Sequence, residues 1–176
     1  MVDYRRVYIK GGTCFFTVTL KNRQSNILTT YIDALRESFA YVKKQQPFEM
    51  IAIVILPEHL HCLWRLPTGD DNYAGRWRAI KARFTHTLIK SGVALHKNNR
   101  GDYNLWQSRY WEHTIRNESD FHHHIDYIHY NPVKHGWVKS VDDWPYSSFH
   151  QFVEKGQLAQ NWGAQYVDSQ QSFGER

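Results

Sequence analysis

The sequence of 176 residues lacks the features that define several large classes of protein. Its two cysteines, Cys14 and Cys62, are too few for a disulfide scaffold or a four-cysteine zinc site, so we expect a reducing, cytoplasmic location. No apolar run approaches the roughly 20 residues of a membrane span, and the longest, Met50 to Leu56, has the length of a strand. The N-terminal residues lack the apolar core of a secretory signal, so we expect no membrane partner.

Acidic residues are missing from one long segment of this basic chain. The whole chain carries a formal net charge of +5, whereas residues 72–101 contain seven Lys and Arg and no Asp or Glu. Residues 73–91 have helical spacing, with an apolar stripe flanked by basic side chains. Such a helix is either a solvated surface or a surface that faces phosphates, and the absence of acids favours the second interpretation. Aromatic residues reach 15%, a composition typical of nucleic-acid binding when it accompanies basic charge.

Hydrophobic periodicity predicts one α+β domain over residues 1–150, followed by a C-terminal tail over 151–176. Strands are predicted over 13–20, 48–56, 59–66 and 110–115, and helices over 29–45, 73–91 and 117–130, with the last helix ending before Pro132. This order is the ferredoxin-like split βαβ plan with a mainly antiparallel sheet and one extra helix.

Two histidines share one face of a predicted strand. His59 and His61 are two residues apart, so both rings point to the same side, while Leu60, Cys62 and Trp64 point into a core. A His-x-His pair is a ready bidentate metal site, because neutral imidazole binds many divalent metals. The alternative is a pair of exposed histidines on an open face.

The helix predicted after Asn117 carries a second group of polar side chains. At 100° per residue, His124, Tyr127 and Asn131 lie on neighbouring positions of one face. They offer an imidazole, a phenol and an amide side by side. The alternatives are an amphipathic edge position for Tyr127 and a helix-ending position for Asn131 before Pro132.

These motifs resemble a known family. PEHLHCLW, which contains His59 and His61, resembles the HUH motif of IS200-type Y1 transposases. DYIHYNPVKHGWV, from Asp126 to Val138, together with YRRVYIKGGTCFFTV and LWQSRYWEHTIRNESDF, resembles the REP-associated tyrosine transposases over roughly residues 3–150. The tandem arrangement of the two motifs is more specific than the HUH motif alone.

The resemblance implies a single-strand DNA endonuclease and strand transferase with the HUH endonuclease fold. Tyr127 would be the nucleophile that forms a 5′-phosphotyrosine. His59, His61 and Asn131 would hold Mg²⁺ or Mn²⁺. The implied partner is single-stranded or hairpin DNA of the REP type, in DNA transposition or the mobilisation of REP elements, and the protein is expected to act as a monomer, although insertion-sequence relatives form dimers.

Six basic residues are expected to contact the DNA. On the basic helix, the side chains predicted to contact the backbone are Arg76, Arg78, Lys81 and Arg83. Arg5 and Arg6, near the N-terminus, are predicted to contact the hairpin foot or the flanking bases.

Two other functions are compatible with parts of the pattern. A domesticated, non-catalytic protein that binds DNA hairpins would use the basic surface but would not need the intact Tyr127, His59 and His61. A metallohydrolase would use the histidines but would give Tyr127 no role.

Overall fold

The structure is a computed structural model that describes residues 9–165 and 173–175. Its elements are β1 (Thr13–Thr19), α1 (Ile27–Thr30), α2 (Ile32–Gln45), β2 (Glu49–Ile55), β3 (His59–Arg65), α3 (Tyr73–Lys90), β4 (Trp111–Thr114), α4 (Glu118–Lys134), the 3-10 helix η1 (Val141–Asp143) and α5 (Phe149–Glu154). The four strands form one antiparallel sheet in the order β2-β3-β1-β4. This confirms the predicted ferredoxin-like α+β fold.

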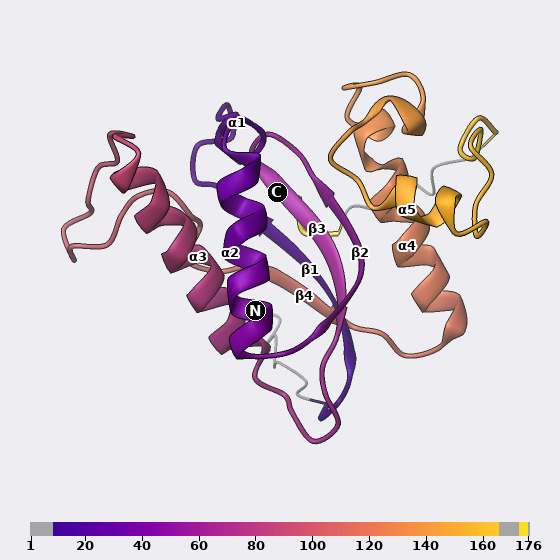
Figure 1. Ribbon diagram of the computed structural model, residues 1–176, viewed down its shortest axis with the longest axis horizontal. Helices are drawn as coiled ribbons and strands as arrows, with labels where there is room; N and C mark the ends of the chain where they lie inside the picture. Colours follow the sequence, from indigo (N-terminus) through magenta and orange to yellow (C-terminus); the bar gives the residue numbers. More distant parts are fainter. Residues whose placement is uncertain (1–8, 166–172, 176) are drawn as a thin grey trace, which may run out of the picture.

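Helices cover both faces of the sheet (Figure 1). α2 and α3 lie on one side, and α4 and α5 lie on the other, beside β2 and β3. Both central strands are therefore buried on both faces, which suits the aromatic and β-branched residues of β1 and the two leucines and the tryptophan of β3. No helix in the described part of the chain is long and apolar enough to span a membrane.

The alternation of side chains along β3 separates two kinds of chemistry. Leu60, Cys62 and Trp64 point toward α2 and α3 and join the larger apolar core. His59 and His61 point the other way, toward α4. Because the strand period is two, this register delivers both histidines to the same side, as predicted.

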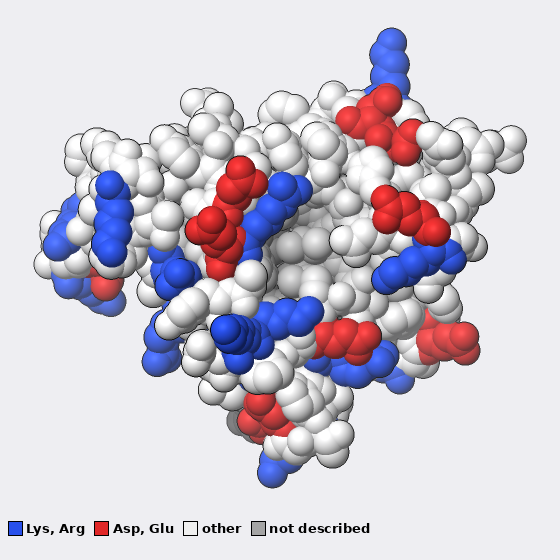
Figure 2. Space-filling model, viewed as in Figure 1, with Lys and Arg blue, Asp and Glu red and all other residues white. Residues whose placement is uncertain are grey.

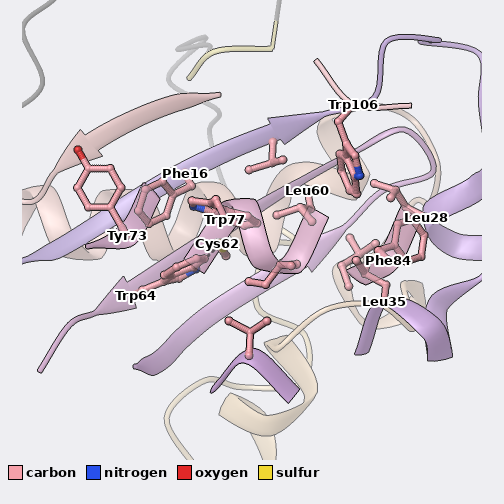
Figure 3. Packing of buried hydrophobic residues seen from close by; sticks show 14 of the residues in the cluster. Phe16, Leu28, Leu35, Leu60, Cys62, Trp64, Tyr73, Trp77, Phe84 and Trp106 are labelled. Carbon is pink, nitrogen blue, oxygen red and sulfur yellow. Dashed lines mark hydrogen bonds between the residues drawn. The ribbon is translucent and has the colours of Figure 1, made fainter. Parts of the chain in front are cut away.

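The core under α3 is built from aromatic rings in close contact (Figure 3). Trp77 of α3 lies 5.5 Å from Phe16 of β1 and 4.5 Å from Trp64 of β3, measured between ring centroids. All three side chains are at most 1% exposed. Their burial removes a large apolar area from water and fixes α3 against the sheet.

The opposite face holds α4 in place through a smaller apolar cluster. Ile125 and Ile128 of α4 pack with Phe15, Val54 and Leu63 of the sheet. The predicted apolar stripe of this helix therefore faces the strands. Tyr127, which is next to this stripe on the helix surface, therefore faces the histidines of β3.

The prediction that the last helix ends before Pro132 is wrong. α4 continues to Lys134 with Pro132 inside it. The proline ring removes only one backbone donor near the helix end, and three bonds close the final turn: His135 N to Asn131 O at 3.0 Å, Gly136 N to Val133 O at 2.9 Å and Trp137 N to Pro132 O at 2.9 Å. Gly136 has a φ of +72°, which suits glycine, and this is a Schellman-type end. Asn131 therefore stays helical, one turn beyond Tyr127.

Described residues of the expected C-terminal tail pack against the domain. The ring of Trp162 lies 6.1 Å from those of His129 and Phe149. Just before the tail, Ser148 N donates to Ile53 O at 2.8 Å, which covers part of the edge of β2.

Buried His129 makes stability depend on pH. Its side chain is fully buried, with Nε2 3.1 Å from Ser148 Oγ, and burial lowers its pKa to about 3. Because an unfolded histidine has a pKa of about 6.5, the unfolded chain takes up a proton below that pH and the folded chain does not. Stability is therefore lost as the pH falls from about 6.5 toward 3.

We expect His129→Gln to lose less stability on acidification than the natural protein. The free energy of unfolding, measured by denaturant titration at pH 7 and pH 5, should fall by about 2 kcal/mol less in the variant. His122→Gln is the matched control, since the His122 side chain is 64% exposed on the same helix. An equal loss in His129→Gln and the natural protein would contradict this account.

Candidate active site

His59 and His61 lie side by side under α4, with ring centroids 4.9 Å apart. Both side chains are fully buried, which excludes the alternative of exposed histidines. Nδ1 of His61 is 2.8 Å from Thr17 Oγ1, and Nδ1 of His59 is 2.8 Å from Glu58 Oε1. These contacts fix the rings, and Nε2 of each is buried and makes no hydrogen bond among the residues described, although Nε2 of His61 lies 3.2 Å from Glu175 Oε1.

Burial keeps His61 in the form that binds cations. Burial, helped by the neighbouring charge of His59, lowers the pKa of His61 well below its usual value. Burial by itself raises the pKa of Glu58, but the hydrogen bond to His59, a backbone hydrogen bond and the charges of His59 and Arg23 together outweigh burial and lower the pKa of the carboxyl group. Neutral imidazole is the form that coordinates a metal ion.

Tyr127 and Asn131 reach the same place from α4. The ring centroids of Tyr127 and His61 are 5.2 Å apart. One oxygen, Glu175 Oε1, lies 2.9 Å from Asn131 Nδ2 and 3.2 Å from His61 Nε2, so these groups surround a common point. Asn131 Oδ1 is buried, with no donor in the described ranges. The two histidine nitrogens and Asn131 Oδ1 are buried acceptor atoms of the types that bind divalent cations, whereas the Asn131 atom that contacts Glu175 Oε1 is the Nδ2 donor.

Lys134 places a positive charge beside the phenol of Tyr127. Its Nζ is 3.5 Å from the phenol oxygen and 4.6 Å from the ring centroid. An adjacent cation favours the phenolate form of tyrosine. Sequence reasoning missed Lys134, although the seven-residue spacing would have indicated it had the helix been extended through Pro132.

The C-terminal residues enter the site, near the end of the chain marked in Figure 1. Glu175 forms a possible metal-binding group with His59 and His61, in which the three ligand atoms lie within 4.8 Å of one another. Burial raises the pKa of Glu175 to about 7. Its Oε2 is 3.4 Å from His135 Nε2 and 3.7 Å from Lys134 Nζ. No local pattern in the sequence indicates this contact, because it joins segments far apart in the chain.

Phe173 covers the candidate nucleophile. Its ring stands edge-on to that of Tyr127, with centroids 4.6 Å apart, and its backbone N–H is 3.4 Å from the phenol oxygen. Tyr127 is only 3% exposed as a result of this and the surrounding packing. Phe173 is therefore one of the residues that cover the Tyr127 side chain in this structure.

His124, which the helical spacing places near Tyr127, belongs to a separate group with His113 and Asp120. Nδ1 of His124 is 2.8 Å from the backbone oxygen of Asp120, and His113 Nε2 is 2.8 Å from Asp120 Oδ2. The two histidine rings stack 4.7 Å apart. These contacts join β4 to the start of α4.

The basic residues predicted on α3 have different surroundings. Arg76 is buried, and its guanidinium pairs with Asp70 at 2.6 Å while donating to the backbone oxygens of residues 46, 47 and 72. The expectation that it contacts DNA is therefore wrong, because it already has protein partners. Arg83 stacks on Tyr41 at 3.8 Å, whereas Arg78 and Lys81 line a cavity.

Arg5 and Arg6, the other cations expected at the DNA, lie outside the described residues.

Comparisons of the sequence and of the fold with known proteins agree on one family. Residues 12–131 match the family described as "Transposase IS200 like". A REP-associated tyrosine transposase from Escherichia coli K12 is 52% identical over the whole of this chain and 98% of its own length. A Haemophilus influenzae relative is 46% identical over 93% of this chain and 94% of its own. A solved structure of a REP-associated tyrosine transposase bound to a REP hairpin is 51% identical, with a TM-score of 0.88 over 100% of this chain and 98% of that one.

The buried nitrogen atoms of His59 and His61 and the buried amide oxygen of Asn131 lead us to predict that the site binds a divalent cation. We expect Mn²⁺ to bind the purified protein at one site when the titration is measured by calorimetry. The His61→Ala variant should bind Mn²⁺ at least about tenfold more weakly. His122→Ala, at an exposed position of α4, should bind as the natural protein does. Unchanged Mn²⁺ binding in His61→Ala would remove the histidine pair from the cation site.

Proposed function

We propose that this chain, which belongs to the IS200-like transposase family, is a single-strand DNA endonuclease and strand transferase that uses Tyr127 as its nucleophile. The observation that carries the proposal is a phenol placed beside a buried set of cation ligands, His59, His61 and Asn131. The relative of known structure is bound to a REP hairpin. The substrate that we propose for this chain is hairpin DNA with a single-stranded flank.

The proposed reaction is an in-line displacement at phosphorus. The Tyr127 phenolate oxygen forms a bond to phosphorus while the bond to the 3′ oxygen breaks. The departing oxygen takes a proton and becomes a 3′-OH, and the 5′ phosphate stays on the tyrosine. Attack by a second 3′-OH reverses these changes and joins the strands.

The residues around Tyr127 have distinct proposed parts in this step. Lys134, 3.5 Å from the phenol oxygen, stabilises the phenolate. Thr17 and Glu58 hold the rings of His61 and His59. Mg²⁺ or Mn²⁺, when bound by the histidines and Asn131, supplies charge neutralisation at a phosphate oxygen. A monomeric state and a cytoplasmic location stay predictions.

The test is a covalent adduct between the protein and a labelled oligonucleotide. The natural protein, incubated with a REP-type hairpin and Mn²⁺ or Mg²⁺, should form an adduct that survives denaturation, and Tyr127→Phe should form none. Tyr130→Phe, one turn along the same helix and partly exposed, should form it normally. Cleavage that persists in Tyr127→Phe would indicate a metallohydrolase, and tight binding without cleavage would indicate a non-catalytic hairpin-binding protein.

Removing the C-terminal residues should accelerate the reaction. A chain that ends at Ser172 lacks Phe173 and Glu175, so the phenol is uncovered and Asn131 and His61 lose their contacts with the carboxylate. We expect a higher initial rate of adduct formation than in the full chain. Phe173→Ala separates the effect of the ring from that of Glu175. A rate equal to or below that of the full chain would show that these residues do not obstruct the substrate.

A further inference from the structure

A cavity of about 880 Å³ opens between α3 and the segment that follows it. We call it the α3 cavity. Several of its rings belong to the core on the α2 and α3 side of the sheet, so it lies on the face opposite His59 and His61. Its size is within the range of ligand sites. The charged and aromatic side chains that matter here are Lys21, Arg78, Lys81, Trp77, Trp106 and Tyr110.

Lys81 is a partly buried cation without an acidic partner in the described part of the chain. Its Nζ donates to Gln107 O at 3.0 Å and lies 5.7 Å and 5.4 Å from the ring centroids of Trp106 and Tyr110. Burial alone lowers its pKa to about 8, with no carboxylate to offset the effect. An ammonium group has three protons to donate, so an anion in the cavity would gain hydrogen bonds and stabilise the charge.

The aromatic wall adds a second requirement on the ligand. Trp106 and Tyr110 lie next to the ammonium, and Trp77 lines the same cavity. The indole N–H of Trp77 is buried and has no acceptor among the described residues. The matching ligand thus combines a negative charge and a flat ring.

The other basic residues of α3 differ from Lys81 in their surroundings. Arg76 is satisfied by Asp70, and Arg83 by the face of Tyr41. Arg78 is exposed and lines the cavity with Lys81 and Lys21, opposed by one acid of the lining, Asp102. Lys and Arg side chains also gather over the projecting end of α3 and the loop after it (Figure 2). The positive field around the cavity therefore favours an anionic strand.

We propose that the α3 cavity binds an unpaired nucleotide of the DNA, with its phosphate at Lys81 and Arg78 and its base against Trp106 and Tyr110. This inference rests on the proposed function and adds to it a second DNA site, remote from Tyr127. A base inside a duplex is stacked on both faces, whereas an unpaired base has a free face to offer an aromatic wall.

The test compares two hairpins that differ only in single-stranded DNA. Fluorescence anisotropy, in EDTA so that no cleavage occurs, measures binding of a blunt hairpin and of the same hairpin with a short oligo-dT extension at its 5′ or 3′ end. Lys81→Met and Arg78→Gln should each weaken binding of an extended hairpin about tenfold. The blunt hairpin should be affected less than about twofold.

Arg83→Gln is the matched control, because it removes the same charge from an exposed position of the same helix outside the cavity. It should leave the advantage of the extended hairpin unchanged. Arg78 is exposed, so its variant tests the cavity even if Lys81→Met changes the stability of the fold. A base analogue, 2-aminopurine, placed along the extension should lose fluorescence at the position that enters the cavity.

Three outcomes would overturn the proposal. Equal losses for blunt and extended hairpins would assign Lys81 and Arg78 to the duplex backbone. Unchanged binding in both variants would show that DNA does not use the cavity. Saturable binding of dTMP that Lys81→Met abolishes, with blunt and extended hairpins binding alike, would assign the cavity to a free nucleotide. None of these results affects the adduct formed by Tyr127, so failure here is distinct from failure of the proposed function.

Discussion

The packing of α4 on the sheet is the interaction on which the candidate site depends. Ile125 and Ile128 press the helix onto Phe15 and Leu63, and this contact buries both histidines of β3 beneath it. The same contact sets the rotation of α4. With its apolar residues against the strands, Tyr127 meets the ring of His61. Any change that rotates or lifts the helix would separate the phenol from the ligand set, because the two halves of the site come from different elements.

Most of the fold and the central site follow from periodicities that are short in range. A period of two along β3 predicts that the histidines share a face, and a period of 3.6 along α4 predicts that Tyr127 and Asn131 do. Pro132 misled the prediction of the helix end, since a proline in the last turn loses little and Gly136 closes the helix beyond it.

The remaining errors involve partners that are distant in sequence. Arg76 has helical spacing and looks like its basic neighbours, but Asp70 and the carbonyl groups after α2 satisfy it in the folded chain. Glu175 and Phe173 reach the site from the end of the chain, and no periodicity indicates such a contact. Contacts of this kind arise from tertiary packing, and the spacing of residue types along the sequence does not specify them. The sheet separates the candidate site on the α4 face from the α3 cavity on the opposite face.

The central claim is that the Tyr127 oxygen becomes bonded to a 5′ phosphate of DNA. The most direct measurement is mass spectrometry of the adduct after nuclease and protease digestion. The account predicts a nucleotide attached through its 5′ phosphate to the peptide that contains Tyr127, with a free 3′-OH on the released strand. A nucleotide attached to another residue, or attached through its 3′ phosphate, would contradict the account.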